Sequence, residues 1–195
     1  PGEKIPEPPA KNPVITIAPV EVNEFASLLD NMPTAIWDST PRNFEKYNQA
    51  YGLICYQTTH SGPGTLEVAG VHDIGLVYSG QAEVGVVYSG SRPPFLDGFL
   101  DRRNRSLKVN IPDDLGKKNG PLWIFVEAMG RVNFGAEVHD RKGLVGPVKF
   151  STQSDTNTLT DWKIFQFPLD QKMLAGLIYK MALAPGPMFY RATIN

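Results

Sequence analysis

The chain has 195 residues, of which 42% are hydrophobic, and its 19 basic and 20 acidic residues nearly cancel. A chain of this length holds one ordinary domain with extensions, or two very small domains, and it can bury a substantial core. Balanced charge without a basic stripe argues against nucleic acid as the main partner. No apolar run approaches the roughly 18 residues of a membrane-spanning helix, so we expect no membrane span.

The residue types that punctuate the chain favour a β-rich domain. Its 17 prolines and 18 glycines lie between short apolar runs, which is typical of many strands joined by turns. Cys55 is the only cysteine, so no internal disulfide can form, and its apolar neighbours predict a buried thiol. The N-terminus lacks the apolar centre of a signal peptide and does not begin with Met, so we interpret the chain as a piece of a longer one.

The first 50 residues are predicted to precede the main domain. Residues 1–12 are Pro-rich and polar, which indicates an extended linker. Residues 13–50 are interpreted as an N-terminal arm that begins with β-prone runs at 14–17 and 20–22. Within the arm, residues 23–31 carry apolar side chains at the spacing of a short helical turn.

A β-sandwich of about eight short strands is predicted over residues 51–167. Residues 51–59 form its first strand, and residues 106–111 alternate as a half-buried antiparallel strand. Residues 122–126 are almost continuously apolar and should form a central strand. Residues 160–167 alternate again, with Trp162, Ile164 and Phe167 as candidates for the inward face.

Two turn motifs lie between these strands. The tetrapeptide Val-Tyr-Ser-Gly occurs at 77–80 and again at 87–90, which we interpret as a local tandem duplication that forms a hairpin. The dipeptide Asp97-Gly98 is typical of a hairpin turn.

Residues 168–195 are predicted to extend beyond the sandwich. Apolar residues between 170 and 183 recur at helical spacing, which predicts a helix. A last strand begins at Met188, and nothing downstream can pair with it.

The sequence offers no recognisable catalytic constellation. Its acidic residues form no pair at the ends of barrel strands, as glycoside hydrolysis would need. His60, His72 and His139 lack the spacing of metal ligands, so we expect them to bond loop backbone. Neither a nucleophile elbow nor a phosphate loop is present. We therefore expect no catalytic residue, no metal and no cofactor in this chain.

The most distinctive stretch is the corner at residues 122–146. Here an apolar strand is followed by a tight turn, by Arg131 and then by a charged cluster. A guanidinium at this place is costly unless it is paired, and Glu127, Asp73 or Asp140 could pair with it. We interpret Arg131 as half of a buried ion pair that locks the corner, in preference to a direct ligand contact.

A family resemblance is carried by the same corner. Its residues are Met129-Gly130-Arg131-Val132-Asn133-Phe134-Gly135 and Asp140-Arg141-Lys142-Gly143. Further matches lie at Tyr51-Gly52, Val71-His72-Asp73 and Asp161-Trp162. On these motifs the chain resembles glycoside hydrolase family 35, the β-galactosidases, from about residue 13 to its end.

This resemblance implies an all-β fold, a galactose-binding-like jelly-roll sandwich with an extended N-terminal arm and a C-terminal helix and strand. In the family, a TIM barrel with both catalytic glutamates precedes this region, and a second sandwich follows it. The implied role is a non-catalytic accessory domain that stabilises the barrel and shapes its cleft. The implied cleft-edge loop contains Arg131, Asn133, Phe134, Asp140 and Arg141.

The implied partners are the catalytic barrel or neighbouring subunits, with β-galactosides as a candidate ligand. The implied compartment is lysosomal, secreted or periplasmic. Phe134 stands where the family usually has Tyr, and Ala128 where it usually has Asn.

Two other functions stay open at this point. The chain could be a structural subunit of a larger assembly that binds neighbours through its arm and its unpaired last strand. It could also be an independent carbohydrate-binding module in which Trp37 or Tyr78 stacks on sugars.

Overall fold

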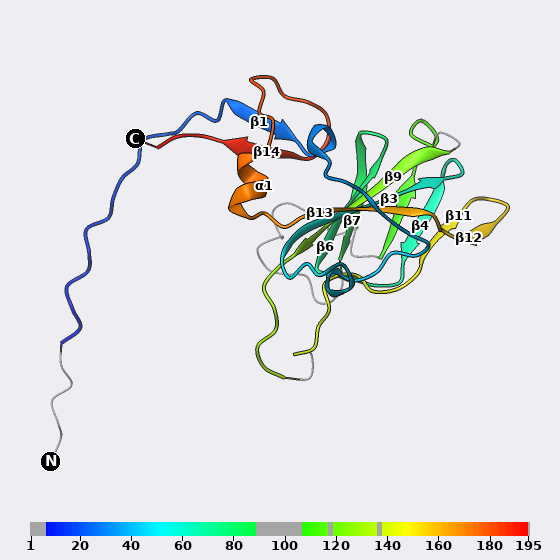
Figure 1. The fold of residues 1–195 in the computed structure, drawn as a ribbon, viewed down its shortest axis with the longest axis horizontal. Helices are drawn as coiled ribbons and strands as arrows, with labels where there is room; N and C mark the ends of the chain where they lie inside the picture. Colours follow the sequence, from blue (N-terminus) through cyan, green and yellow to red (C-terminus); the bar gives the residue numbers. More distant parts are fainter. Residues whose placement is uncertain (1–6, 89–106, 117–118, 136–137, 195) are drawn as a thin grey trace, which may run out of the picture.

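A computed structural model of the protein describes residues 7–88, 107–116, 119–135 and 138–194 (Figure 1). The fold is an all-β sandwich of two antiparallel sheets, in agreement with the fold class predicted from the sequence. The larger sheet has the strand order β2-β13-β3-β9-β6-β7, and the smaller has the order β12-β11-β4-β8. Two further pairs, β10-β5 and β1-β14, complete the described strands.

The strands of the larger sheet are β2 (Ile36–Asp38), β3 (Gly52–His60), β6 (Ile74–Ser79), β7 (Ala82–Tyr88), β9 (Gly120–Ala128) and β13 (Trp162–Phe167). Those of the smaller sheet are β4 (Gly64–Val68), β8 (Lys108–Ile111), β11 (Val148–Ser151) and β12 (Thr156–Thr158). The short pair is β5 (Val71–His72) with β10 (Gly143–Leu144), and the separate pair is β1 (Glu24–Ser27) with β14 (Met188–Arg191). The helices are η1 (Leu29–Asn31), η2 (Phe44–Tyr47) and α1 (Gln171–Ala175).

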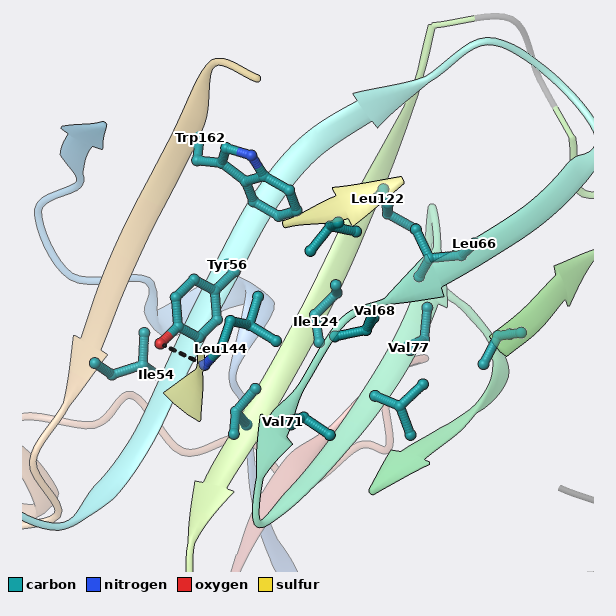
Figure 2. Packing of buried hydrophobic residues seen from close by; sticks show 14 of the residues in the cluster. Ile54, Tyr56, Leu66, Val68, Val71, Val77, Leu122, Ile124, Leu144 and Trp162 are labelled. Carbon is teal, nitrogen blue, oxygen red and sulfur yellow. Dashed lines mark hydrogen bonds between the residues drawn. The ribbon is translucent and has the colours of Figure 1, made fainter. Parts of the chain in front are cut away.

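The main core lies between the larger and the smaller sheet of the sandwich (Figure 2). Strand β9 occupies a central position between β3 and β6, as its apolar sequence predicts, and it turns Leu122, Ile124 and Val126 inward. Trp162 is fully buried and satisfies its indole N–H by donating to the Leu159 carbonyl at 3.0 Å. Each large apolar side chain buried in this way contributes about 1.5–3 kcal/mol to folding.

A second apolar cluster covers the opposite face of the larger sheet. It is formed by Leu28, Cys55, Tyr78, Phe125, Phe165 and Phe167, and residues near η1 and α1 pack over them. Cys55 is fully buried, as predicted, and burial raises the pKa of its thiol well above the usual value. Phe167 therefore belongs to this outer cluster and not to the inward face.

The separate pair β1-β14 lies beside the sandwich, next to α1 (Figure 1). It joins two segments more than 160 residues apart in sequence, with Glu24 opposite Arg191 and Ser27 opposite Met188. The expectation that the last strand is unpaired is therefore wrong, because its partner lies upstream. Phe25 also exchanges two backbone hydrogen bonds of 2.8 Å with Lys180 on the other edge of β1.

Two helix predictions differ from the structure because tertiary pairing prevails over local spacing. Residues 24–27 form strand β1, and only the η1 turn that follows is helical. The helix predicted over 170–183 is limited to α1. Asp170 caps its N-terminus by accepting a hydrogen bond from the Met173 N–H at 2.7 Å, and the helix ends at its C-cap, Gly176. Beyond it the chain runs to the Phe25 bridge, and Met181 is 83% exposed.

The remaining differences concern the arm and the repeat. Residues 14–17 and 20–22 form no strand, and residues 36–38 of the predicted arm join the larger sheet as β2. The first Val-Tyr-Ser-Gly copy ends β6 at the hairpin to β7, as predicted. The end of the second copy and the Asp97-Gly98 turn lie outside the described residues. None of the helices in the described ranges has the length and apolar character needed to cross a membrane.

Candidate functional site

The corner between β9 and β10 begins where β9 ends at Ala128 and finishes where the chain returns to the sandwich at Gly143. Gly143 has φ +95°, and a Cβ at this position would come within 2.4 Å of the Tyr56 hydroxyl. Only glycine fits this close approach. It allows β10 to pair with β5, with Gly143 opposite His72, so both ends of the corner are fixed to the core.

The centre of the corner is a buried cation, Lys142, whose side chain is 1% exposed. Its ammonium donates to both carboxylate oxygens of Asp73, at 3.0 and 2.9 Å, and to Asp140 Oδ2 at 2.8 Å. A buried ammonium is strongly unfavourable without such partners. The position of Lys142 therefore requires Asp73 and Asp140 to converge on it.

Further hydrogen bonds connect this cluster to its surroundings. Asp73 Oδ2 accepts from the Met129 N–H at 2.8 Å, which fixes the turn that follows β9. His72 Nδ1 pairs with Asp140 Oδ1. The imidazole therefore bonds a carboxylate, whereas the sequence predicted a bond to loop backbone. His60 does bond backbone, through the Gly62 carbonyl at 2.8 Å, and also Ser79 at 3.0 Å.

Protonation of the cluster is tied to this geometry. Burial alone would raise the pKa of Asp140, but the hydrogen bond from Lys142 and the charge of His72 hold that pKa below its usual 3.8. Burial alone would lower the pKa of Lys142, but its hydrogen bonds to Asp140 and Asp73 raise that pKa above its usual 10.5. Both shifts favour the charged forms.

Arg131 is not the buried charge that the sequence suggested. Its side chain is 42% exposed, and its ion-pair partner is Glu45 of η2, at 2.7 Å from Nη1. Its Nη2 donates to the Ala50 carbonyl at 2.7 Å, and its contact with Asp140 is a 3.5 Å hydrogen bond to the backbone carbonyl. The prediction of a buried pair with Glu127, Asp73 or Asp140 is therefore wrong, because Lys142 occupies the buried position.

The surface of the corner combines a hollow with an exposed loop. The hollow has a volume of about 470 Å³ and is lined by Glu45, Lys46, Arg131, Val138, His139, Asp140 and Arg141. Beyond it, Phe134 is 90% exposed and Val132 is also exposed. The corner therefore presents an exposed aromatic side chain in addition to the polar hollow.

The structure therefore separates the five predicted site residues into two groups. Arg131, Asp140 and Arg141 meet around the hollow, whereas Asn133 and Phe134 lie on the exposed loop. The sequence reasoning missed Glu45 and the central role of Lys142. Glu45 follows Asn43, whose side chain caps η2 by accepting from the Lys46 N–H at 3.1 Å, but this local signal gives no hint of Arg131.

Within the described ranges, no group of three His, Cys, Asp or Glu side chains is placed to hold a metal ion.

Comparisons with known proteins give one consistent result. A protein family described as "Beta-galactosidase, first all-beta domain" matches residues 41–170. A β-galactosidase of Xanthomonas manihotis is 34% identical over 100% of this chain, which covers 30% of that protein. β-Galactosidase 1 of Dictyostelium discoideum is 27% identical over 93% of the chain and 27% of its own length. The Homo sapiens β-galactosidase is 35% identical over 67% of the chain and 17% of its own length.

The first prediction from the corner concerns its buried cation. Replacing Lys142 with Met keeps most of the side-chain volume but leaves Asp73 and Asp140 without their shared partner, so we expect a loss of about 3–5 kcal/mol in unfolding free energy. Arg131→Ala is the matched control, because an exposed pair contributes only about 0–1 kcal/mol. Urea unfolding of both variants measures the difference, and equal losses would contradict this assignment.

A second prediction concerns pH. Because the pKa of Asp140 is lowered by folding, its contribution to stability is complete above the usual 3.8 and is lost as pH falls through the lowered folded value. Because the pKa of Lys142 is raised, its contribution is complete below 10.5 and is lost as pH rises through the raised folded value. The stability difference between the parent and Lys142→Met should therefore shrink at both extremes. A constant difference from pH 3 to pH 11 in urea midpoints would refute the assignment.

Proposed function

The chain belongs to the β-galactosidase family as its first all-β domain, and from this premise we propose that it is a non-catalytic accessory domain that stabilises the catalytic part and shapes the edge of its cleft. The relatives are about three to six times as long as the part that this chain matches, so the domain is one part of a larger protein in each of them. Hydrolysis of terminal β-galactosides is assigned, in this proposal, to a catalytic part outside this chain.

The observation that carries the proposal is the contrast within the corner. Its base is fixed by the buried Lys142 cluster and by the pairing of β10 with β5. Its loop presents Phe134, 90% exposed, and Arg131, whose guanidinium is held by Glu45 and Ala50. A loop whose base is fixed loses little conformational entropy when it meets another surface, which suits a residue that has to hold a position at a cleft edge.

In this proposal the five residues have different roles. Phe134 and Asn133 would contact the catalytic part or the substrate at the cleft edge. Arg131, Asp140 and Arg141 would position the loop and form its polar rim. The jelly-roll topology and the boundaries at residues 12 and 167 are parts of the same proposal, whereas β2 places residues 36–38 with the sandwich and not with the arm.

A second candidate function is a structural subunit of a larger assembly. It is favoured by the arm, where Val14 and Ile15 are 92% and 82% exposed. A segment with such side chains is suited to docking along a neighbouring protein. Its contact would serve assembly alone, so loss of the arm would change association without changing catalysis.

The test of the accessory function uses a chimera. In the Xanthomonas manihotis β-galactosidase, the matching region is deleted or replaced by this chain, and hydrolysis of a chromogenic β-galactoside is measured. We expect deletion to abolish soluble, active enzyme and replacement to restore it. In the replaced enzyme, Phe134→Ala should lower kcat/KM by about tenfold without changing the melting temperature, as expected for loss of one aromatic contact.

Two results would contradict this function. One is hydrolysis of the galactoside by the 195-residue chain alone. The other is full activity and unchanged melting temperature after the matching region is deleted. The assembly function predicts instead that Phe134→Ala has no effect on kcat/KM, whereas removal of residues 1–22 changes the oligomeric state.

A further inference from the structure

A row of aromatic and polar side chains crosses the larger sheet on its outer face, away from the corner. The strand registers place its members opposite one another in sequence from β2 to β7: Trp37, Lys163, Gln57, Trp123, Tyr78 and Glu83. Partners in an antiparallel register point to the same face of a sheet. The side chains on this row therefore form one continuous line across all six strands.

The neighbouring rows show that this line faces outward. The next row of the sheet contains the residues that are one position along each strand from members of the first row: Ile164, Tyr56, Ile124 and Val77. These four also lie opposite one another, and all of them belong to the core between the sheets. Successive residues of a strand point to opposite faces. The row of Trp37 and Trp123 therefore lies on the face opposite the core.

This row is more accessible than the apolar row beside it, and its two ends, Trp37 and Glu83, are exposed. Phe165, Cys55 and Phe125 lie opposite one another in that second row and are buried in the outer cluster. Trp37, by comparison, is 68% exposed. Lys163, Gln57 and Trp123 are half-buried, Glu83 is exposed, and Tyr78 alone is buried. Tyr78 cannot serve as a surface platform for stacking, so that earlier alternative is wrong for this residue.

The two indoles are held in place by their neighbours. The Lys163 ammonium lies 4.8 Å from the centre of the Trp37 ring, a cation–π contact that restrains an otherwise exposed side chain. Trp123 is braced by Phe125 and Phe165, with ring centres 6.5 and 6.1 Å away. The indoles are three strands apart, which is roughly 14 Å at the usual strand spacing.

We propose that this row is a binding site for a linear, neutral oligosaccharide, separate from the corner and independent of its proposed function. Pyranose rings have an apolar face of C–H groups that packs on an indole. Their hydroxyls need both hydrogen-bond donors and hydrogen-bond acceptors as partners. Between the two indoles the row offers the Gln57 amide and the Lys163 ammonium, and at its far end it offers the Glu83 carboxylate, which accepts from the Tyr78 hydroxyl at 3.1 Å.

A polypeptide fits the row less well than a sugar chain. The backbone groups of the central strands are used within the sheet, so this face offers side chains only. A peptide strand would gain more by pairing with the edge of β2 that has no partner among the described strands than by crossing the strands. An oligosaccharide needs only ring faces and hydroxyl partners, and the row supplies both along one line.

The test measures binding of hexasaccharides of β-linked galactan and β-linked glucan by the 195-residue protein, using calorimetry and tryptophan fluorescence. Trp162 is fully buried, so Trp37 and Trp123 should account for any change in emission. We expect at least one hexasaccharide to bind and to shift the emission to shorter wavelength. Trp37→Ala should weaken binding about tenfold or more, as expected for the loss of one aromatic contact.

Gln57→Ala is the second variant, because it removes a hydrogen-bonding group without touching an aromatic residue, and it should weaken binding severalfold. Tyr51→Ala is the matched control, since Tyr51 is an exposed aromatic residue outside the row and the corner, so its loss should leave binding unchanged. Urea unfolding checks that each variant is folded. The proposal is overturned if neither hexasaccharide binds at millimolar concentration, if Trp37→Ala binds as the parent does, or if Tyr51→Ala abolishes binding.

Discussion

The constraint on which the rest of the corner depends is the burial of one ammonium group. Lys142 is 1% exposed and has two carboxylates within 3.0 Å, from Asp73 and Asp140. Because an unpaired charge is so costly in the interior, the chain has to return to Asp73 at the end of the loop. That return places Gly143 against Tyr56 and pairs β10 with β5. The exposed segment with Phe134 is thus attached to the sandwich at both ends.

Most of the sandwich follows from local sequence patterns, and its exceptions have a common cause. The apolar run at 122–126 and the alternation at 160–167 predict strands that the structure contains as β9 and β13. Residues 24–27 have helical spacing but form a strand, because β14 offers a partner from the far end of the chain. The helix predicted to reach 183 ends at Ala175, because Gly176 ends it and Lys180 pairs with Phe25. Long-range pairing of this kind leaves no trace in a local pattern.

The site was predictable in place but not in detail. The family motifs locate the corner, and three of its five predicted residues meet around one hollow. Neighbours in sequence do not reveal which of two cations is buried, so Arg131 seemed the better candidate although Lys142 holds that position. The observed partner of Arg131 is Glu45, which lies 86 residues away in the sequence. The row from Trp37 to Glu83 was equally hidden, because it exists only through the registers of six strands.

The most direct test of the central claim, that Lys142 and Asp140 form one buried charged unit, is a double-mutant cycle. The unfolding free energies of the parent, Lys142→Met, Asp140→Asn and the double variant are measured in urea at neutral pH. The structure predicts a coupling energy between the two positions of about 1–3 kcal/mol, with the double variant less damaged than the sum of the single ones. Additive effects, equal to within about 0.5 kcal/mol, would contradict the claim that this pair holds the corner together.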